Sequence, residues 1–194
     1  MYCRLTAGAL ALGLVACARS TDLPTSQDFK LDVTVTPEAS PPLNALNFEA
    51  HAVGDQEVPP RDTPAQGQAV FHLSADGTTM EYRLLVANIT NVVASHIHIG
   101  AAGVNGPIVV FLFGNAPPGG GRVDGVLASG SFTAAKFINV LAGHPMSDLI
   151  AAMRAGHAYV NVHTNDGIPP INTGRGDFPG GEIRDQVGGG HVNH

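Results

Sequence analysis

The sequence predicts an all-β domain, a mainly antiparallel β-sandwich or flattened barrel that carries one short helix. Short runs with a period of two alternate with turn signals along most of the chain. The 194 residues include 24 Gly and 14 Pro, a content that favours many turns and short strands over long helices. Only 145–155 (PMSDLIAAMRA) has convincing helical spacing, and Gly156 follows as a stop signal.

The strands are expected between turn signals, and each is short. The segment Ser-Ala-Asp-Gly-Thr at 74–78 separates two alternating runs and predicts a hairpin. A Gly-rich turn separates VVASHIHIG from PIVVFLF in the same way. The expected strands are 48–52, 67–74, 80–88, 92–100, 107–113, 125–132, 157–164 and 181–187.

The chain is expected to divide into four parts. Residues 1–16 resemble a lipoprotein signal peptide, with a short n-region and an apolar stretch too short to span a bilayer. Residues 17–44 form a polar, Pro-punctuated linker, 45–187 form the folded domain, and 188–194 form a flexible tail.

Cys17 is the expected lipidation site. Leu14-Val15-Ala16-Cys17 has the pattern of a lipobox, in which small apolar residues precede the cysteine that takes the lipid. Acyl chains such as palmitate would then anchor an exported protein to a membrane, which is the outer membrane or its periplasmic face in a Gram-negative host. The alternative is an ordinary secretory signal with an incidental cysteine. Because Cys3 is the only other cysteine, no disulfide is expected within the domain.

Period two also assigns faces within the strands. In HIHIG, His96 and His98 point to the side opposite Ile97 and Ile99. In HAYVNVHT, the residues expected opposite the core are Tyr159, Asn161 and His163.

Four motifs follow one another along the predicted domain: QEVPP at 56–60, HIHIG at 96–100 with Gly103 and Asn105-Gly106-Pro107, YVNVHT at 159–164, and PGGEIR at 179–184. In this order they resemble the motifs of the CHRD (chordin-type) domain family. Asp185 departs from the family pattern, which reads GEIRGQ where this chain has GEIRDQ, and the loop after Thr164 is longer than in compact members. The resemblance implies a β-rich extracytoplasmic domain, as in chordin, which binds growth factors, and in bacterial lipoproteins of unassigned activity.

The histidines permit two interpretations. If their strands are neighbours, His96, His98 and His163 could converge on copper or zinc, which neutral imidazoles bind well, with Glu182 completing or orienting the set. Alternatively, they belong to a structural hydrogen-bond network. Ring nitrogens gathered around one point would support the metal, whereas rings bonded to Glu182, Asn161 or the backbone would support the network. The other members of that network are Asn161, Thr164, Glu182 and Arg184.

Composition excludes some functions and leaves two. A formal charge of −6 without any basic run argues against nucleic acid. With neither a domain cysteine nor a Gly-x-Ser-x-Gly motif, a hydrolase triad has no nucleophile, and no catalytic residue is assigned. The first expectation is a non-enzymatic, membrane-anchored module that binds an extracytoplasmic protein. The second is a copper or zinc protein, either a carrier or a superoxide-dismutase-like enzyme.

Overall fold

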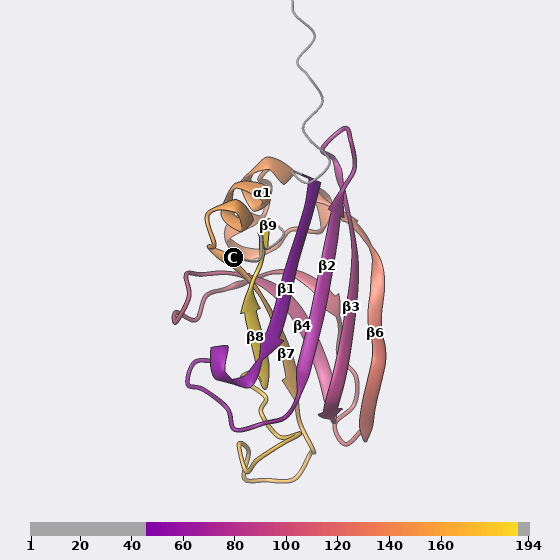
Figure 1. The fold of residues 1–194 in the computed structure, drawn as a ribbon, viewed down its shortest axis with the longest axis vertical. Coiled ribbons are helices and arrows are strands. Elements are labelled where there is room, and N and C mark those ends of the chain that lie inside the picture. The colour runs from indigo at the N-terminus through magenta and orange to yellow at the C-terminus, as the bar shows by residue number, and fades with distance from the viewer. Residues whose placement is uncertain (1–45, 190–194) are drawn as a thin grey trace, which may run out of the picture. The chain divides into compact units, whose positions relative to one another are not determined.

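Residues 46–189 are described by a computed structural model, and they form one mainly antiparallel sheet with a single α-helix (Figure 1). The all-β expectation with one short helix is therefore confirmed. The helix, α1, spans Met146–Arg154. The strands are β1 (Asn47–Val53), β2 (Gln66–Leu73), β3 (Thr79–Thr90), β4 (Val92–Ile99), β5 (Ile108–Phe113), β6 (Arg122–Thr133), β7 (Ala158–Thr164), β8 (Ile183–Gln186) and β9 (Gly188–Gly189).

The sheet curls into a nearly closed barrel. Its strand order is β5-β4-β7-β8-β1-β2-β3-β6, with β9 paired to β1. A side chain links the end strand β5 to β3, the neighbour of the other end strand β6, because the Tyr82 hydroxyl of β3 donates a 2.7 Å hydrogen bond to the Leu112 carbonyl of β5. The strand pairing continues through Gly189, two residues beyond the expected domain end at 187. The expected signal peptide, Cys17 and the whole expected linker lie outside the described residues, as do residues 190–194 of the expected tail.

Local sequence signals account for the turns. In the hairpin between β2 and β3, Gly77 has a φ of +71°, and its amide donates to the Ser74 carbonyl at 2.9 Å. The Asp76 carboxylate accepts the Thr78 amide at 3.0 Å, as aspartates in tight turns do. The two strands then remain in register from Leu73–Met80 to Gln66–Ala87.

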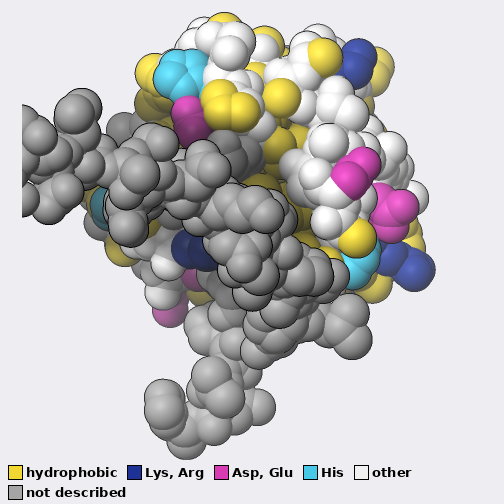
Figure 2. Space-filling view, turned by 90° about the horizontal axis from the view of Figure 1, so that it is seen from above, with side chains coloured by type: hydrophobic (Ala, Val, Ile, Leu, Met, Phe, Trp, Pro, Cys, Tyr) yellow, Lys and Arg dark blue, Asp and Glu magenta, His cyan; other side chains and the backbone are white. Residues whose placement is uncertain are grey.

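The apolar core fills the inside of the barrel, and α1 covers the end at which β1 begins (Figure 1). Leu149 and Met153 of the helix are fully buried, and they are joined by Leu84, Ile97, Val160 and Ile183 from the sheet. In the view onto that end, the visible lysine and arginine side chains lie apart from one another rather than in one basic patch (Figure 2). No helix within 46–189 is long and apolar enough to cross a bilayer.

Candidate metal site

Strands β4 and β7 bring the three histidines together on the outer side of the barrel wall. These strands pair antiparallel, with His96 opposite Asn161, His98 opposite Tyr159, and Ala94 opposite His163. Residues directly opposite in an antiparallel pair point to the same face of the sheet. The three imidazoles therefore lie on one face, while Ile97 points to the core with no exposed surface.

Two loops cover this face and contact the rings. The His98 Nδ1 donates to the Gly106 carbonyl at 2.9 Å, and the His163 Nδ1 donates to the Pro179 carbonyl at 2.9 Å. Gly106 is required for the first contact, because a side chain there would overlap the Ile99 backbone. Under this cover His96 and His98 are only 5% and 7% exposed.

These hydrogen bonds determine which ring nitrogens carry protons. Because carbonyl oxygens only accept, neutral His98 and His163 are protonated on Nδ1, which leaves a lone pair on each Nε2. The His96 Nδ1 lies 3.0 Å from the His163 Nε2 and must therefore be the donor. The Nε2 atoms of His96 and His98 are buried without a hydrogen-bond partner among the described residues. A buried acceptor left unpaired costs about 1–3 kcal/mol.

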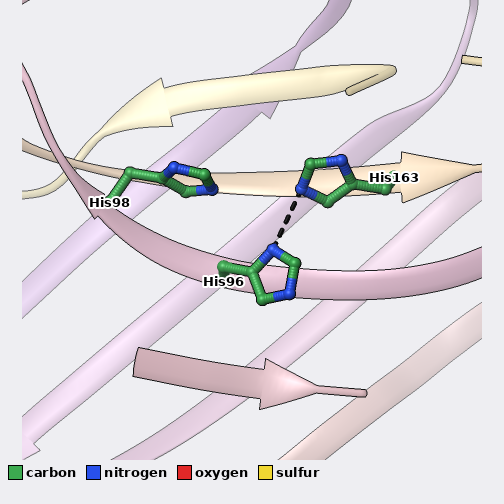
Figure 3. A group of neighbouring side chains, drawn as sticks. All are labelled: His96, His98 and His163. Atoms are coloured by element: carbon green, nitrogen blue, oxygen red, sulfur yellow. Dashed lines mark hydrogen bonds between the residues drawn. The ribbon is translucent and has the colours of Figure 1, made fainter. Parts of the chain in front are cut away.

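One nitrogen of each ring faces the space between the three side chains (Figure 3). The three candidate ligand atoms all lie within 4.8 Å of one another. Three points with that spacing are all within about 2.8 Å (4.8/√3) of a common point. Since a zinc–imidazole bond measures about 2.0–2.1 Å, inward shifts of less than about 1 Å would bring the three nitrogens to bonding distance from an ion.

The electrostatics keep the rings neutral. Burial lowers the pKa of His96 to about 3, and the nearby His163 and His98 add to this effect. Burial likewise lowers the pKa of His98 to about 4, partly opposed by its hydrogen bond to Gly106. The pKa of His163 is also lowered by burial. Neutral imidazole is the form that binds metal ions, so at neutral pH no proton has to leave the site before binding.

Aromatic rings enclose the site on two sides. Phe111 of β5 meets His96 edge to face, with ring centroids 4.6 Å apart and an interplanar angle of 89°. Tyr159 stacks on His98 with centroids 4.7 Å apart and an interplanar angle of 10°. The Arg184 guanidinium carbon lies 3.5 Å from the centroid of the Tyr159 ring. Sequence reasoning missed Phe111, because nothing in the PIVVFLF run marks it as a neighbour of His96.

Asn161, Thr164, Glu182 and Arg184, the other residues expected in the network, are all buried and hydrogen-bonded, but none of their hydrogen bonds found in the structure reaches an imidazole. Asn161 donates to the Glu57 carboxylate at 2.8 Å. Arg184 donates to the Asn105 side chain and to the Ala101 and Val104 carbonyls of the loop 100–107. These contacts hold the covering loop in place without reaching the imidazoles.

Glu182 does not complete or orient the histidine set. Its carboxylate accepts hydrogen bonds from the Thr63 and Thr164 hydroxyls, both at 2.6 Å, and from the Gly176 amide at 2.9 Å. All three bonds connect loops and strand ends. The acidic ligand that the sequence suggested is therefore already used by the fold.

Glu57 is a buried carboxyl that the sequence did not single out for a role. It lies in the QEVPP motif, is 3% exposed, and accepts the Val58 amide at 3.3 Å in addition to the Asn161 amide. Burial raises its pKa from 4.5 to about 7, although the Val58 hydrogen bond and the charge of Arg184 oppose the shift. Its position within a motif was the signal that could have identified it.

Comparison with known proteins gives one positive result. The family model described as the CHRD domain matches residues 48–169, which include the first three motifs and all three histidines of the site. Neither a curated protein nor a solved structure matches the chain.

Proposed function

Because the chain belongs to the CHRD domain family, we propose that it is a membrane-anchored, extracytoplasmic binding protein of that family. We further propose that it binds a copper or zinc ion through His96, His98 and His163. The family membership supplies the fold, and the metal is inferred from the side chains of this chain.

One observation carries the proposal: the two rings whose Nδ1 atoms are tied to backbone carbonyls direct their Nε2 lone pairs toward the same space. A metal-binding histidine usually donates its second ring N–H to a carbonyl or carboxylate, which fixes the tautomer and the ring orientation. The Gly106 and Pro179 carbonyls supply this support. His96 would contribute Nδ1 by moving its proton to Nε2, and the 3.0 Å hydrogen bond to His163 would be replaced by metal coordination.

A purely structural network explains the same residues less well. Hydrogen bonds to the backbone are what such a network predicts, and His98 and His163 do make them. A network that served only the fold would also satisfy the buried Nε2 atom of His98, which has no partner among the described residues. A bound ion would use the His98 Nε2 as a ligand.

The metal experiment compares the full-length protein with a matched pair of variants. After anaerobic loading with copper or zinc and removal of unbound ion, metal analysis is expected to give one ion per chain. The double variant His96→Ala/His98→Ala should lose it. His144→Ala removes an exposed histidine that pairs with Asp148 instead, and it should bind as the wild type does. Equal binding by the double variant and the wild type would refute the metal function.

The membrane anchor is tested separately at Cys17. If this residue carries the lipid, Cys17→Ala should move the protein from the membrane fraction to the soluble fraction after cell breakage. Cys3→Ala, which changes a residue inside the expected signal peptide, should leave the distribution unchanged. A Cys17→Ala protein that stays in the membrane fraction would contradict lipidation at this site.

We propose a binding role without catalysis. Within 46–189, His96 bonds to His163, and His98 and His163 bond to the Gly106 and Pro179 carbonyls, so none of the three rings is hydrogen-bonded to an acidic side chain that could act as a general base. An anchored domain of this kind would hold the ion near a membrane surface, where an extracytoplasmic protein could deliver or receive it.

A further inference from the structure

We infer that the histidine site selects copper(I) over divalent ions. This inference rests on the proposed metal function and deepens it by naming the ion. Three features of the site lead to it: the charge of its ligands, their number, and the groups that surround them.

The ligand set carries no negative charge. The group of side chains that could hold an ion consists of three histidines, and the nearby carboxylates of Glu57 and Glu182 are bonded to other residues. A divalent ion bound by neutral imidazoles would keep its full double charge in a buried place. The cost of burying an ion grows with the square of its charge, so a monovalent ion is penalised about one quarter as much.

The number of ligands also favours copper(I). Zinc sites in proteins are almost always tetrahedral, and copper(II) prefers four ligands near a plane, so each divalent ion needs a fourth donor. Copper(I) has a filled d shell and is stable with three ligands. The candidate group in the described part of the chain offers three, and Phe111 of β5 packs edge to face against one of them, His96.

The surrounding charge acts in the same direction. The guanidinium of Arg184 is almost completely buried and lies over Tyr159, which in turn stacks on His98. Tyr159 therefore lies between the Arg184 charge and His98. At any given distance, a fixed positive charge repels a divalent ion about twice as strongly as a monovalent one. Arg184 is held there by three hydrogen bonds to the covering loop, so it cannot swing away when an ion binds.

The test measures affinities for three ions on the full-length protein in detergent. Copper(I) is buffered anaerobically with a bathocuproine chelator, and copper(II) and zinc(II) are titrated against chromophoric chelators. Copper(I) should bind at one ion per chain and at least about 100-fold more tightly than zinc(II) or copper(II). Affinity for zinc(II) or copper(II) equal to or above that for copper(I) would overturn the inference and leave the metal function intact. Binding of none of the three ions would refute both.

A surface variant tests the role of the cover. Phe111 is 48% exposed, so Phe111→Ala should fold, and we expect that uncovering His96 would let water approach the ion as a fourth ligand. The ratio of copper(I) to zinc(II) affinity should fall at least about tenfold. Val126→Ala, which removes a side chain of 47% exposure on β6, should leave the ratio unchanged. An unchanged ratio in Phe111→Ala would contradict the assignment of water exclusion to this ring.

Discussion

At the scale of single residues, the ionisation of the buried Glu57 carboxyl should make the free energy of unfolding depend on pH. Because its folded pKa of about 7 is raised above the unfolded value of 4.5, it contributes stability below about pH 4.5, which is lost as the pH rises through about 7. Glu57→Gln keeps the shape and cannot ionise. Relative to wild type, this variant should therefore gain stability progressively between pH 4.5 and 7 and reach a plateau above that range.

Urea unfolding curves of both proteins at a series of pH values would measure this difference. The buried histidines, whose pKa values are shifted in the opposite direction, are present in both proteins and cancel in the comparison. Glu81→Gln, at an exposed position on β3, is the control and should follow the wild-type profile. A stability difference between Glu57→Gln and wild type that does not change with pH would show that Glu57 ionises equally easily in the folded and unfolded chain.

Gly181 illustrates how one missing side chain makes the buried Glu57–Asn161 pair possible. Its φ is +127°, and a methyl group added there would overlap the Glu57 carboxylate and the Asn161 amide. Gly181→Ala should lower the free energy of unfolding by about 2–4 kcal/mol, through backbone strain and crowding together. Gly180→Ala is the matched control, because the nearest atom there is the end of the Arg61 side chain at 3.9 Å. Equal urea midpoints for the two variants would contradict this explanation.

At the scale of secondary-structure elements, the sequence predicted the strands better than their partners. Alternation in HIHIG and HAYVNVHT placed His96, His98 and His163 on polar faces, and the structure puts these faces side by side. Pairing of β4 with β7 could not be derived, because nearly sixty residues separate them and period two describes each strand alone. The covering loops could not be predicted either. Their contact with His98 is made by the backbone carbonyl of Gly106, and every residue has such a carbonyl.

Arg184 of β8 makes three hydrogen bonds to the loop 100–107, and Gln186 of the same strand adds one to the Gly100 carbonyl at 3.0 Å. Arg184 binds the Ala101 and Val104 carbonyls through Nη2, both at 3.0 Å, and the Asn105 side chain through Nη1 at 3.2 Å. Arg184→Lys keeps the charge but loses the planar fork that reaches all three. We expect a loss of about 2–4 kcal/mol in unfolding free energy and faster amide hydrogen exchange at Val104.

Arg122→Lys provides the control for this substitution. Arg122 is an exposed arginine that pairs with Asp124 at the surface, where such pairs contribute little. Its replacement should change stability by less than about 0.5 kcal/mol. If Arg184→Lys were equally mild and the exchange of the Val104 amide stayed slow, the loop would have to be held by other contacts, such as the Asn105 hydrogen bond to the Val58 carbonyl.

At the scale of the whole molecule, the barrel must reach its stability without a disulfide, because both cysteines precede residue 18. Packing inside the barrel provides one layer, and the loops over β4 and β7 add a second, largely polar layer on the outer wall. The histidine site connects the strands to the covering loops. Its three histidines come from two strands, and two of them are hydrogen-bonded to the covering loops. An ion bound there would connect segments more than sixty residues apart in the sequence.

Copper(I) binding should therefore stabilise the entire domain. A ligand that binds only the folded state adds about 2.7 kcal/mol when its free concentration is 100 times its Kd. Anaerobic thermal unfolding with buffered copper(I) should show a Tm raised by several degrees, and hydrogen exchange should slow in β4, β7 and both loops that bind the rings. His98→Ala should abolish the shift while His144→Ala preserves it. An ion that binds the wild-type protein without raising its Tm must be held elsewhere in the chain, because binding between β4 and β7 cannot occur without opposing their separation.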